Sequence, residues 1–334
     1  MFSKIKIIAE AGVNHNGIYK NSLRLIDAAK KAKADYVKFQ AYKTEELVLN
    51  NTPLAKYQSK NFKKKISQYD LLKKYELKNY EYKKLKVYAQ KKKIKLLFSV
   101  FDEVSLKILL DLKMNEFKVP SGEIDNFLLL RKIAKIAKKV YLSTGMSSIK
   151  TIKKTYDFLI KNGLNKKDII VLHCTSSYPT KLGDANLLAI NHLKKITNNI
   201  GFSDHTISFE ASLLAVALGA SLIEKHITLN NKMAGPDHQA SINPKKFKEY
   251  VKFIKNAEIA LGNDKKKIYH SEFENIKIVK KCIVAKRDIK KNEIFSEKNL
   301  TTKRPMSGIP SSQILKILGK KSPKNFNKNE IIKF

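Results

Sequence analysis

The chain has no tryptophan and only two cysteines, Cys174 and Cys282, among its 334 residues. Two cysteines this far apart in the sequence cannot supply the disulfide framework on which small secreted domains depend. No apolar run is long enough to cross a membrane, and the apolar part of residues 1–12 is too short for a secretory signal. We therefore expect a reduced, cytoplasmic protein without a targeting peptide and without a membrane partner.

Arginine is also scarce, although the formal net charge is +37. Only four of the 67 basic residues are arginines: Arg24, Arg131, Arg287 and Arg304. A large positive charge is typical of nucleic-acid-binding proteins, but recognition of bases and phosphates favours the two-pronged guanidinium group. The lysines are spread along the whole chain, which indicates solvated helix surfaces. We expect no nucleic-acid partner; a basic nucleic-acid-binding module is the alternative of a different class.

The glycine-rich G-x-G-x-x-G loop of dinucleotide-binding sheets does not follow the first predicted strand, 4–11. What the chain has is an alternation of strand-like and helix-like segments. The other predicted strands are 35–42, 95–101, 116–120, 140–145, 168–176, 200–204 and one that ends at Leu229. About eight strands with intervening helices over roughly 260 residues predict an α/β protein with a (β/α)8 TIM barrel. An open doubly wound sheet is the alternative.

The pattern changes after the barrel-like part. We expect a TIM barrel over residues 1–262, a charged linker over 263–275 and a small β-rich module over 276–334. The last segment contains short β-prone pieces separated by turn signals. It is too short to bury much core by itself, so we expect it to dock on the barrel or on a partner subunit.

Two histidines, His205 and His226, each end a β-prone run, and a helical segment, 207–220, connects them. In a β-helix-β unit the two strands run parallel, so their C-terminal ends open on the same face. Two neutral imidazoles that meet there can bind a divalent metal ion. The alternative is a pair of hydrogen-bonded core histidines. Three carboxylates nearby favour the metal site: Asp204, Glu224 and Asp237.

Polar residues recur near the C-terminal end of nearly every predicted strand, with apolar residues on the alternate face. They are Glu10, Lys38, Gln40, Ser99, Lys118, Ser121, Glu123, Ser143, Ser176, Ser203, His205 and His226. Lysines and hydroxyls suit a phosphate or carboxylate ligand, and a metal held by two histidines can polarise a carbonyl group. The carboxylates suit proton transfer or sugar hydroxyls. These residue types predict a substrate with a phosphate and a second one with a carbonyl group.

Several longer motifs resemble those of the sialic acid synthase family. They are IIAEAGVNHNG (7–17), DYVKFQAYKTEELV (35–48), FKVPSGEIDN (117–126), LSTGM (142–146), LHCTSSYPT (172–180), GFSDHT (201–206), ALGASLIEKHITL (217–229) and GPDH (235–238). Residues 282–305 resemble that family's C-terminal antifreeze-like (SAF) domain. The resemblance implies a TIM barrel followed by a SAF domain.

By this resemblance, the chain condenses phosphoenolpyruvate with N-acetylmannosamine to give N-acetylneuraminate and phosphate. A legionaminate synthase, which uses 2,4-diacetamido-2,4,6-trideoxymannose, shares the same motifs and stays open. A 3-deoxy-aldulosonate phosphate synthase is a more distant possibility, since it requires a further site for the phosphate of its sugar.

The resemblance also implies roles for residues. The divalent metal, usually manganese in the family, is held by His205 and His226. Phosphoenolpyruvate contacts map onto Lys38, Ser99, Lys118, Ser121, Ser143 and Ser203. Sugar contacts map onto Glu10, Gln40, Glu123, Tyr178, Asp237 and Arg304. We expect catalytic roles for Glu10, Glu123 and the metal ligand His226. Because the counterpart of Arg304 reaches a neighbouring active site in the family, a domain-exchanged homodimer is implied.

Overall fold

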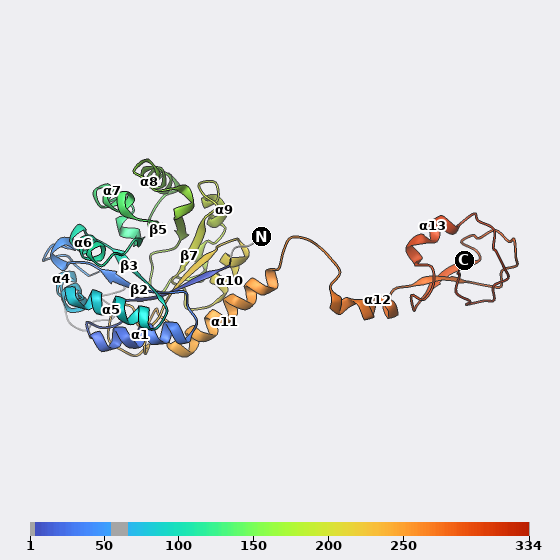
Figure 1. Cartoon of the computed structure of the whole chain (residues 1–334), viewed down its shortest axis with the longest axis horizontal. Helices are drawn as coiled ribbons and strands as arrows, with labels where there is room; N and C mark the ends of the chain where they lie inside the picture. The colour runs from blue at the N-terminus through green and yellow to red at the C-terminus, as the bar shows by residue number, and fades with distance from the viewer. Residues whose placement is uncertain (1–3, 55–65, 334) are drawn as a thin grey trace. The chain divides into compact units, whose positions relative to one another are not determined.

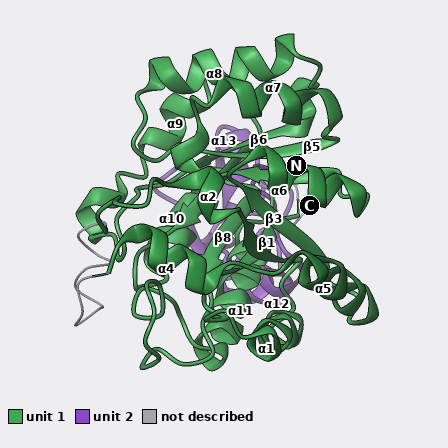
Figure 2. Cartoon of the chain, turned by 90° about the vertical axis from the view of Figure 1, so that its left-hand side faces the viewer, with its two compact units in different colours: residues 1–263 green, residues 264–334 purple. Residues whose placement is uncertain are grey.

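The computed structural model describes residues 4–54 and 66–333, and the chain divides into two compact units, Met1–Asn263 and Asp264–Phe334 (Figure 2). In the first unit, eight parallel strands close into a barrel in chain order. The strands are β1 Lys6–Gly12, β2 Tyr36–Ala41, β3 Lys95–Val100, β4 Glu116–Val119, β5 Lys139–Ser143, β6 Ile169–His173, β7 Ile200–Asp204 and β8 Leu222–His226. Because β1 pairs with β8, the predicted TIM barrel is confirmed and the open sheet is excluded.

Helices surround the barrel (Figure 1). They are α1 Tyr19–Lys31, α5 Asn79–Lys91, α6 Glu103–Asp111, α7 Phe127–Ile136, α8 Ile149–Lys161, α9 Ala189–Leu193, α10 Glu210–Ala217 and α11 Pro244–Leu261. Two more, α2 Thr44–Leu47 and α4 Gln68–Tyr75, follow β2, and three short 3-10 turns are η1 Ser121–Glu123, η2 Lys166–Asp168 and η3 Leu182–Ala185. Helix α8 shows why they form: Ser148 caps its first turn, and Ile152, Tyr156 and Leu159 recur at helical spacing and are buried.

An apolar layer fills the barrel interior and lies directly below the polar residues of interest. It consists of Ile8, Tyr36, Leu97, Tyr141, Leu172 and Leu222. Two positions further along the same strands stand Glu10, Lys38, Ser99, Ser143, Cys174 and Glu224. Alternate residues of a strand face the same side. The apolar layer therefore lies inside the barrel directly below a layer of polar side chains at its C-terminal end.

Asp204 faces the opposite way from the histidine beside it. Its carboxylate lies 2.9 Å from Lys225 Nζ and accepts a hydrogen bond of 2.6 Å from Ser212 of α10. Both charged side chains are fully buried. The sequence grouping of Asp204 with the histidine pair is therefore wrong: strand alternation places this carboxylate on the outer face of the barrel, where it holds β7 and β8 to α10.

The second unit has its own small core. It contains η4 His270–Glu272, α12 Phe273–Val279, η5 Ser311–Gln313, α13 Ile314–Ile317 and a two-stranded antiparallel sheet of β9 Cys282–Ala285 and β10 Leu300–Lys303. One cluster of buried apolar residues forms this core: Ile283, Ala285, Ile289, Phe295, Leu300, Ile317, Phe326 and Ile332. The predicted linker boundary at 275 falls inside α12. Within the described ranges, no helix combines the length and apolarity needed to cross a bilayer.

Candidate active site

A pocket of about 480 Å³ opens at the C-terminal ends of the barrel strands. The side chains that line it include every predicted site residue of the first unit: Glu10, Lys38, Gln40, Ser99, Lys118, Ser121, Glu123, Ser143, Tyr178, Ser203, His205, His226 and Asp237. Arg304 lies exposed after β10 in the second unit, and its part in the site stays a prediction. The eight strands and the loops that follow them thus bring these polar side chains together in one pocket.

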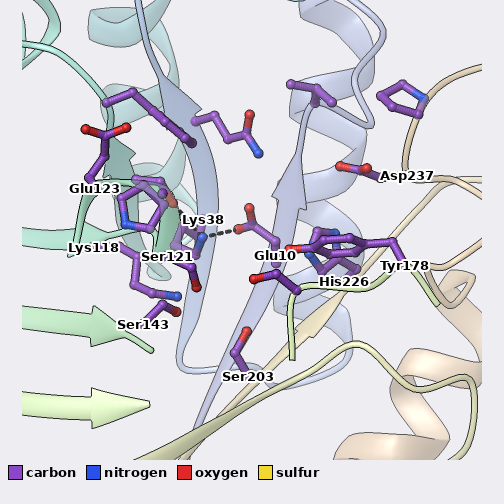
Figure 3. A pocket seen from close by; sticks show the side chains of 18 of the residues that line it. Glu10, Lys38, Lys118, Ser121, Glu123, Ser143, Tyr178, Ser203, His226 and Asp237 are labelled. Carbon is purple, nitrogen blue, oxygen red and sulfur yellow. Dashed lines mark hydrogen bonds and ion pairs between the residues drawn. The ribbon is translucent and has the colours of Figure 1, made fainter. Parts of the chain in front are cut away.

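Four buried charges form a chain of alternating sign in this pocket, and Figure 3 shows three of them, Glu10, Lys38 and Lys118. Lys38 Nζ lies 2.8 Å from Glu10 and 3.6 Å from Glu224, and Lys118 Nζ lies 2.8 Å from Glu224. The contact with Glu10 Oε2 has ion-pair distance without hydrogen-bond geometry, so this oxygen has no hydrogen-bond partner among the described residues. Burying such charges is tolerable only because each has an opposite charge beside it.

The two carboxyl groups of this chain differ in their readiness to ionise. Burial raises the pKa of Glu10 to about 7, although Lys38 acts in the opposite direction. Burial also opposes ionisation of Glu224, but Lys118 and Lys38 together hold its pKa well below its usual range. Near neutral pH, Glu224 is therefore the fixed anion, and Glu10 can hold or release a proton.

The rings of His205 and His226 lie 5.4 Å apart, and burial keeps both neutral by lowering the pKa of His205 to about 4 and that of His226 well below its usual value. Nδ1 of His205 lies 2.7 Å from the carbonyl of Thr175. Because a carbonyl can only accept, this nitrogen carries the proton and Nε2 keeps its lone pair. Nδ1 of His226 is buried without a hydrogen-bond partner in the described parts of the chain.

These features suit a divalent metal ion. A ligating histidine usually donates its second N–H to a carbonyl or carboxylate, as His205 does to Thr175. In the ranges described, no group of three or more His, Cys, Asp or Glu side chains is placed to hold a metal. Among the described residues the protein thus offers two imidazoles, and an ion held by them would have positions open for water and substrate.

Three of the predicted sugar contacts lie around Gly12. It has φ of +50° at a bulge between β1 and β2. A Cβ at this position would lie 3.2 Å from Glu10, 3.7 Å from Asp237 and 3.7 Å from Gln40. The backbone therefore approaches these side chains closely because residue 12 has none.

Gly145 plays a similar part on the opposite side of the barrel. Its N–H donates to Ser121 Oγ over 3.0 Å, and Cys174 Sγ lies 3.4 Å from the same oxygen. A Cβ on Gly145 would lie 2.8 Å from Ser121 Oγ and would clash with Ser176 Oγ. The hydroxyls after β4 and β6 therefore converge at this glycine.

Tyr178 and Glu123 complete the rim. The centre of the Tyr178 ring lies 4.3 Å from that of His205 and 5.6 Å from that of His226. Figure 3 shows Tyr178 beside His226. Glu123 accepts a hydrogen bond of 2.8 Å from Asn126, and its partial burial raises its pKa.

Sequence reasoning missed several lining residues. The sequence places Glu224 near the histidine pair but does not predict it as a pocket residue that pairs with Lys38 and Lys118; its spacing of two residues from His226 along one strand is the available signal. Gly12 and Gly145 gave no signal of their own. The largest group not predicted is an apolar wall, which comes from the long connection after β2 and from loops: Val13, Leu47, Leu71, Leu72, Tyr75 and Phe101.

Comparison with known proteins identifies the family to which this chain belongs. Residues 25–266 match the NeuB family, and residues 280–334 match the SAF domain. The chain belongs to the NeuB family. It is 44% identical over 331 residues to the N,N'-diacetyllegionaminic acid synthase of Campylobacter jejuni, with 99% of each chain covered. It is 37% identical to the synthase of the same name from Legionella pneumophila, with 96% of this chain and 91% of the relative covered.

A solved structure agrees with this assignment to the NeuB family. The N-acetylneuraminic acid synthetase of Leptospira borgpetersenii, crystallised with citrate, superposes with a TM-score of 0.71 at 36% identity, covering 82% of this chain and 90% of that one. The resemblance to the sialic acid synthases and the SAF domain is thereby confirmed.

One pocket residue of this NeuB-family chain should make stability depend on pH. Burial raises the pKa of Asp237 from its ordinary 3.8 to about 6. The folded protein therefore holds this proton more tightly than the unfolded chain does, and the associated stability is present below pH 4 and lost as pH rises through about 6. At about 1.4 kcal/mol for each pKa unit, the loss is about 3 kcal/mol. Asp237→Asn should avoid it.

Urea unfolding at pH 4 and pH 7.5 checks this expectation. Asp237→Asn should gain up to about 3 kcal/mol over the natural protein at pH 7.5 and little at pH 4. The exposed Asp184 provides the control, since Asp184→Asn should change neither value. An equal gain in the free energy of unfolding at both pH values would show that burial does not raise the pKa of the Asp237 carboxyl group.

Proposed function

We propose that this chain condenses phosphoenolpyruvate with the open-chain aldehyde of an N-acylated hexose, giving a nine-carbon 2-keto sugar acid and phosphate. The observation that carries the proposal is the convergence of two buried lysines, several hydroxyls and a neutral histidine pair in one barrel-end pocket. Membership of the NeuB family supports it.

The anion site is the half of the pocket around Lys118. Lys118 and Lys38 supply positive charge, and Lys38 Nζ also donates to Ser99 Oγ over 2.7 Å. Ser121, Ser143 and Ser203 line the same pocket and can donate hydrogen bonds to phosphate or carboxylate oxygens. These six residues are our proposed phosphoenolpyruvate contacts.

The proposed metal is Mn²⁺, held by His205 and His226. When bound, such an ion supplies Lewis acidity that makes the aldehyde carbon more electrophilic toward C3 of phosphoenolpyruvate. The two neutral imidazoles orient the site, since the Thr175 carbonyl fixes the tautomer of His205. Tyr178 packs against both rings and shields them from bulk water.

Proton transfer is assigned to Glu10, with Glu123 as the second candidate. As C3 of phosphoenolpyruvate bonds to the aldehyde carbon, the aldehyde oxygen takes up a proton and C2 becomes electron-poor. Water then adds to C2 and loses a proton, and the new C2 hydroxyl loses its proton as the C2–O bond to phosphate breaks, which leaves the keto group and free phosphate. Glu10 lies beside His226 in the strand register and at 2.8 Å from Lys38, so it borders both halves of the pocket. A carboxyl group with a pKa of about 7 can exchange protons at neutral pH.

Glu10→Gln should therefore lower kcat by about 10²- to 10⁴-fold, the usual contribution of a general acid or base. Manganese binding, measured by metal content after dialysis, should be unchanged because both histidines remain. Glu123→Gln is the matched comparison, with a smaller expected loss. Near-normal turnover of Glu10→Gln would remove Glu10 from this role and transfer it to Glu123.

The apolar wall favours a sugar with several methyl groups. In 2,4-diacetamido-2,4,6-trideoxymannose, two acetyl groups and C6 end in methyls, whereas N-acetylmannosamine has a single one and a hydroxymethyl group. Val13, Leu71 and Phe101 offer apolar surface for such groups. Lys38 and Lys118 are the only Lys or Arg side chains among the described lining residues, and both are assigned to phosphoenolpyruvate. A phosphate group on the sugar would therefore have no cationic side chain of its own in this pocket, which argues against a phosphorylated sugar. We propose the diacetamido sugar, and N-acetylmannosamine as the second candidate.

Phosphate release tests both parts of the proposal. The purified protein is stripped of metal, supplied with Mn²⁺ and phosphoenolpyruvate, and given each sugar separately. Release with the diacetamido sugar alone supports the proposed branch, and release with N-acetylmannosamine alone supports the second candidate. No release with either, from folded and metal-loaded protein, would refute the reaction.

We also propose a cytoplasmic homodimer in which the SAF domain of each chain completes the pocket of the other. Helix α12 has no buried residue, and Phe273, Ile278 and Val279 are 47%, 63% and 45% exposed, so an apolar face is available for a partner. Mixing inactive His226→Gln with inactive Arg304→Ala protein should restore activity if Arg304 acts in the neighbouring pocket. A mass in solution equal to that of one chain, measured by light scattering, would contradict this arrangement.

A further inference from the structure

The loop between β8 and α11 carries Asp237 into the pocket, and two asparagines of the β1–α1 loop hold it from behind. The first is Asn14, which is fully buried. Its Nδ2 donates to the carbonyl of Ile227 over 2.9 Å and to Ser241 Oγ over 2.8 Å. Ser241 Oγ in turn donates to the backbone carbonyl of Asp237 over 2.6 Å. Asn14 thus reaches the backbone of Asp237 through one hydroxyl.

The second asparagine, Asn16, bonds the same loop at two other points. Its Nδ2 donates to the carbonyl of Ala234 over 2.9 Å, and its Oδ1 lies 2.8 Å from Nε2 of His238. The other ring nitrogen of His238, Nδ1, lies 2.6 Å from Oγ1 of Thr228, two residues after the end of β8. His238, which belongs to the β8–α11 loop, therefore forms a bridge that connects this loop to the β1–α1 loop and to the residues that follow β8.

The proton positions in this bridge follow from its partners. An amide oxygen can only accept, so Nε2 of His238 carries a proton and donates to Asn16 Oδ1. The Thr228 hydroxyl accepts from the backbone N–H of Asn230 over 3.1 Å and has two acceptors for its own proton, the Asn230 carbonyl at 3.1 Å and Nδ1 of His238 at 2.6 Å. Because a neutral ring that is protonated on Nε2 keeps a lone pair on Nδ1, the shorter contact is assigned as a hydrogen bond from Thr228 to Nδ1. Burial lowers the pKa of His238 to about 4, which agrees with a neutral ring.

Gly235 shows how closely these groups are packed. A Cβ at this position would lie 2.5 Å from the His238 ring and 2.9 Å from Asn16 Oδ1. The loop backbone can pass over the bridge only because residue 235 lacks a side chain. Asp237 is two residues further on, so the bridge fixes the chain next to the residue that enters the pocket.

We propose that Asn14, Asn16 and His238 are positioning residues which hold Asp237 in place for the sugar, with His238 neutral and protonated on Nε2. The proposal rests on the proposed function, since the contact of Asp237 with the sugar belongs to it. None of the three side chains lines the pocket, so each acts through the loop. Their effect should fall on the sugar and spare phosphoenolpyruvate, whose proposed contacts lie on other strands.

Steady-state kinetics test the positioning role. His238→Ala should raise KM for the sugar by tenfold or more, as small displacements of a positioned group do, and should change KM for phosphoenolpyruvate less than about twofold. His238→Gln should recover part of the loss, because its amide N–H can still reach Asn16. The exposed His192 on α9 supplies the control, with His192→Gln expected to behave as the natural protein. Equal changes in both KM values, or none, would overturn the proposal.

Nitrogen NMR of the histidine rings tests the tautomer without any reaction. The chain has seven histidines, and the His238 signals are those that disappear in His238→Gln. They should show protonated Nε2 and unprotonated Nδ1 from pH 6 to pH 8. A ring protonated on Nδ1, or on both nitrogens, would overturn the assignment. Because this result does not depend on turnover, failure of the bridge and failure of the proposed reaction can be told apart.

Discussion

Replacing His226 with glutamine is expected to abolish manganese-dependent phosphate release, with a loss of more than about 10³-fold. Lewis-acid assistance contributes several kcal/mol to such a reaction, and each 1.4 kcal/mol corresponds to about tenfold in rate. The natural ring is neutral, because burial holds its pKa well below the usual value. The substitution therefore removes a metal ligand without removing a charge, and the barrel should stay folded.

Metal content and phosphate release are measured on the same sample. His226→Gln should retain circular dichroism like that of the natural protein but lose bound Mn²⁺. The exposed His192→Gln protein is the control for a histidine-to-glutamine change as such. Full turnover with Mn²⁺ still bound would mean that the pair of histidines is not the metal site.

Replacing Lys118 with methionine is expected to weaken phosphoenolpyruvate binding by more than about 100-fold and to destabilise the fold by about 3–5 kcal/mol, the usual effect of breaking a buried pair. Glu224 would lose its cationic partner at 2.8 Å and keep Lys38 at 3.6 Å and the hydrogen bond of 2.8 Å from Ser203 Oγ. Its fixed negative charge would then oppose an anionic ligand as well.

A double variant separates the two effects. Lys118→Met with Glu224→Gln removes both charges, so stability in urea should largely return while phosphoenolpyruvate binding, measured by calorimetry, should not. The control is Lys153→Met, which breaks an exposed pair with Asp157 and should cost no more than about 1 kcal/mol. Normal phosphoenolpyruvate binding by the double variant would contradict the anion site around Lys118.

The architecture and most of the pocket could be predicted because they depend on local patterns. Strand and helix periodicity identified the barrel, and the alternation of side chains along a strand placed Lys38 and Gln40 on one face. The 21 residues from His205 to His226 correspond to one β-helix-β unit, and their rings indeed lie 5.4 Å apart. A closed barrel converts such local regularities into one shared site, because all its strands end on the same face.

Other features required the folded chain. The sequence did not show that Glu224 sits between Lys118 and Lys38, that Asp204 serves Lys225 on the outer face, or that the connection after β2 forms an apolar wall. These depend on which side chains meet across strands and loops, and chain neighbours do not determine that.

The bridge between Asn16 and His238 is the clearest case, since 222 positions separate its two residues. The motifs NHNG and GPDH were visible as segments, and Asp237 was predicted as a sugar contact from the second of them. The sequence by itself therefore determined the barrel, the order of its strands and the chemical types at its mouth, because these follow from local periodicity. The tertiary structure alone decided the ionic partners, the protonation of buried groups and the support of the Asp237 loop, because burial and distance arise only when remote segments pack together.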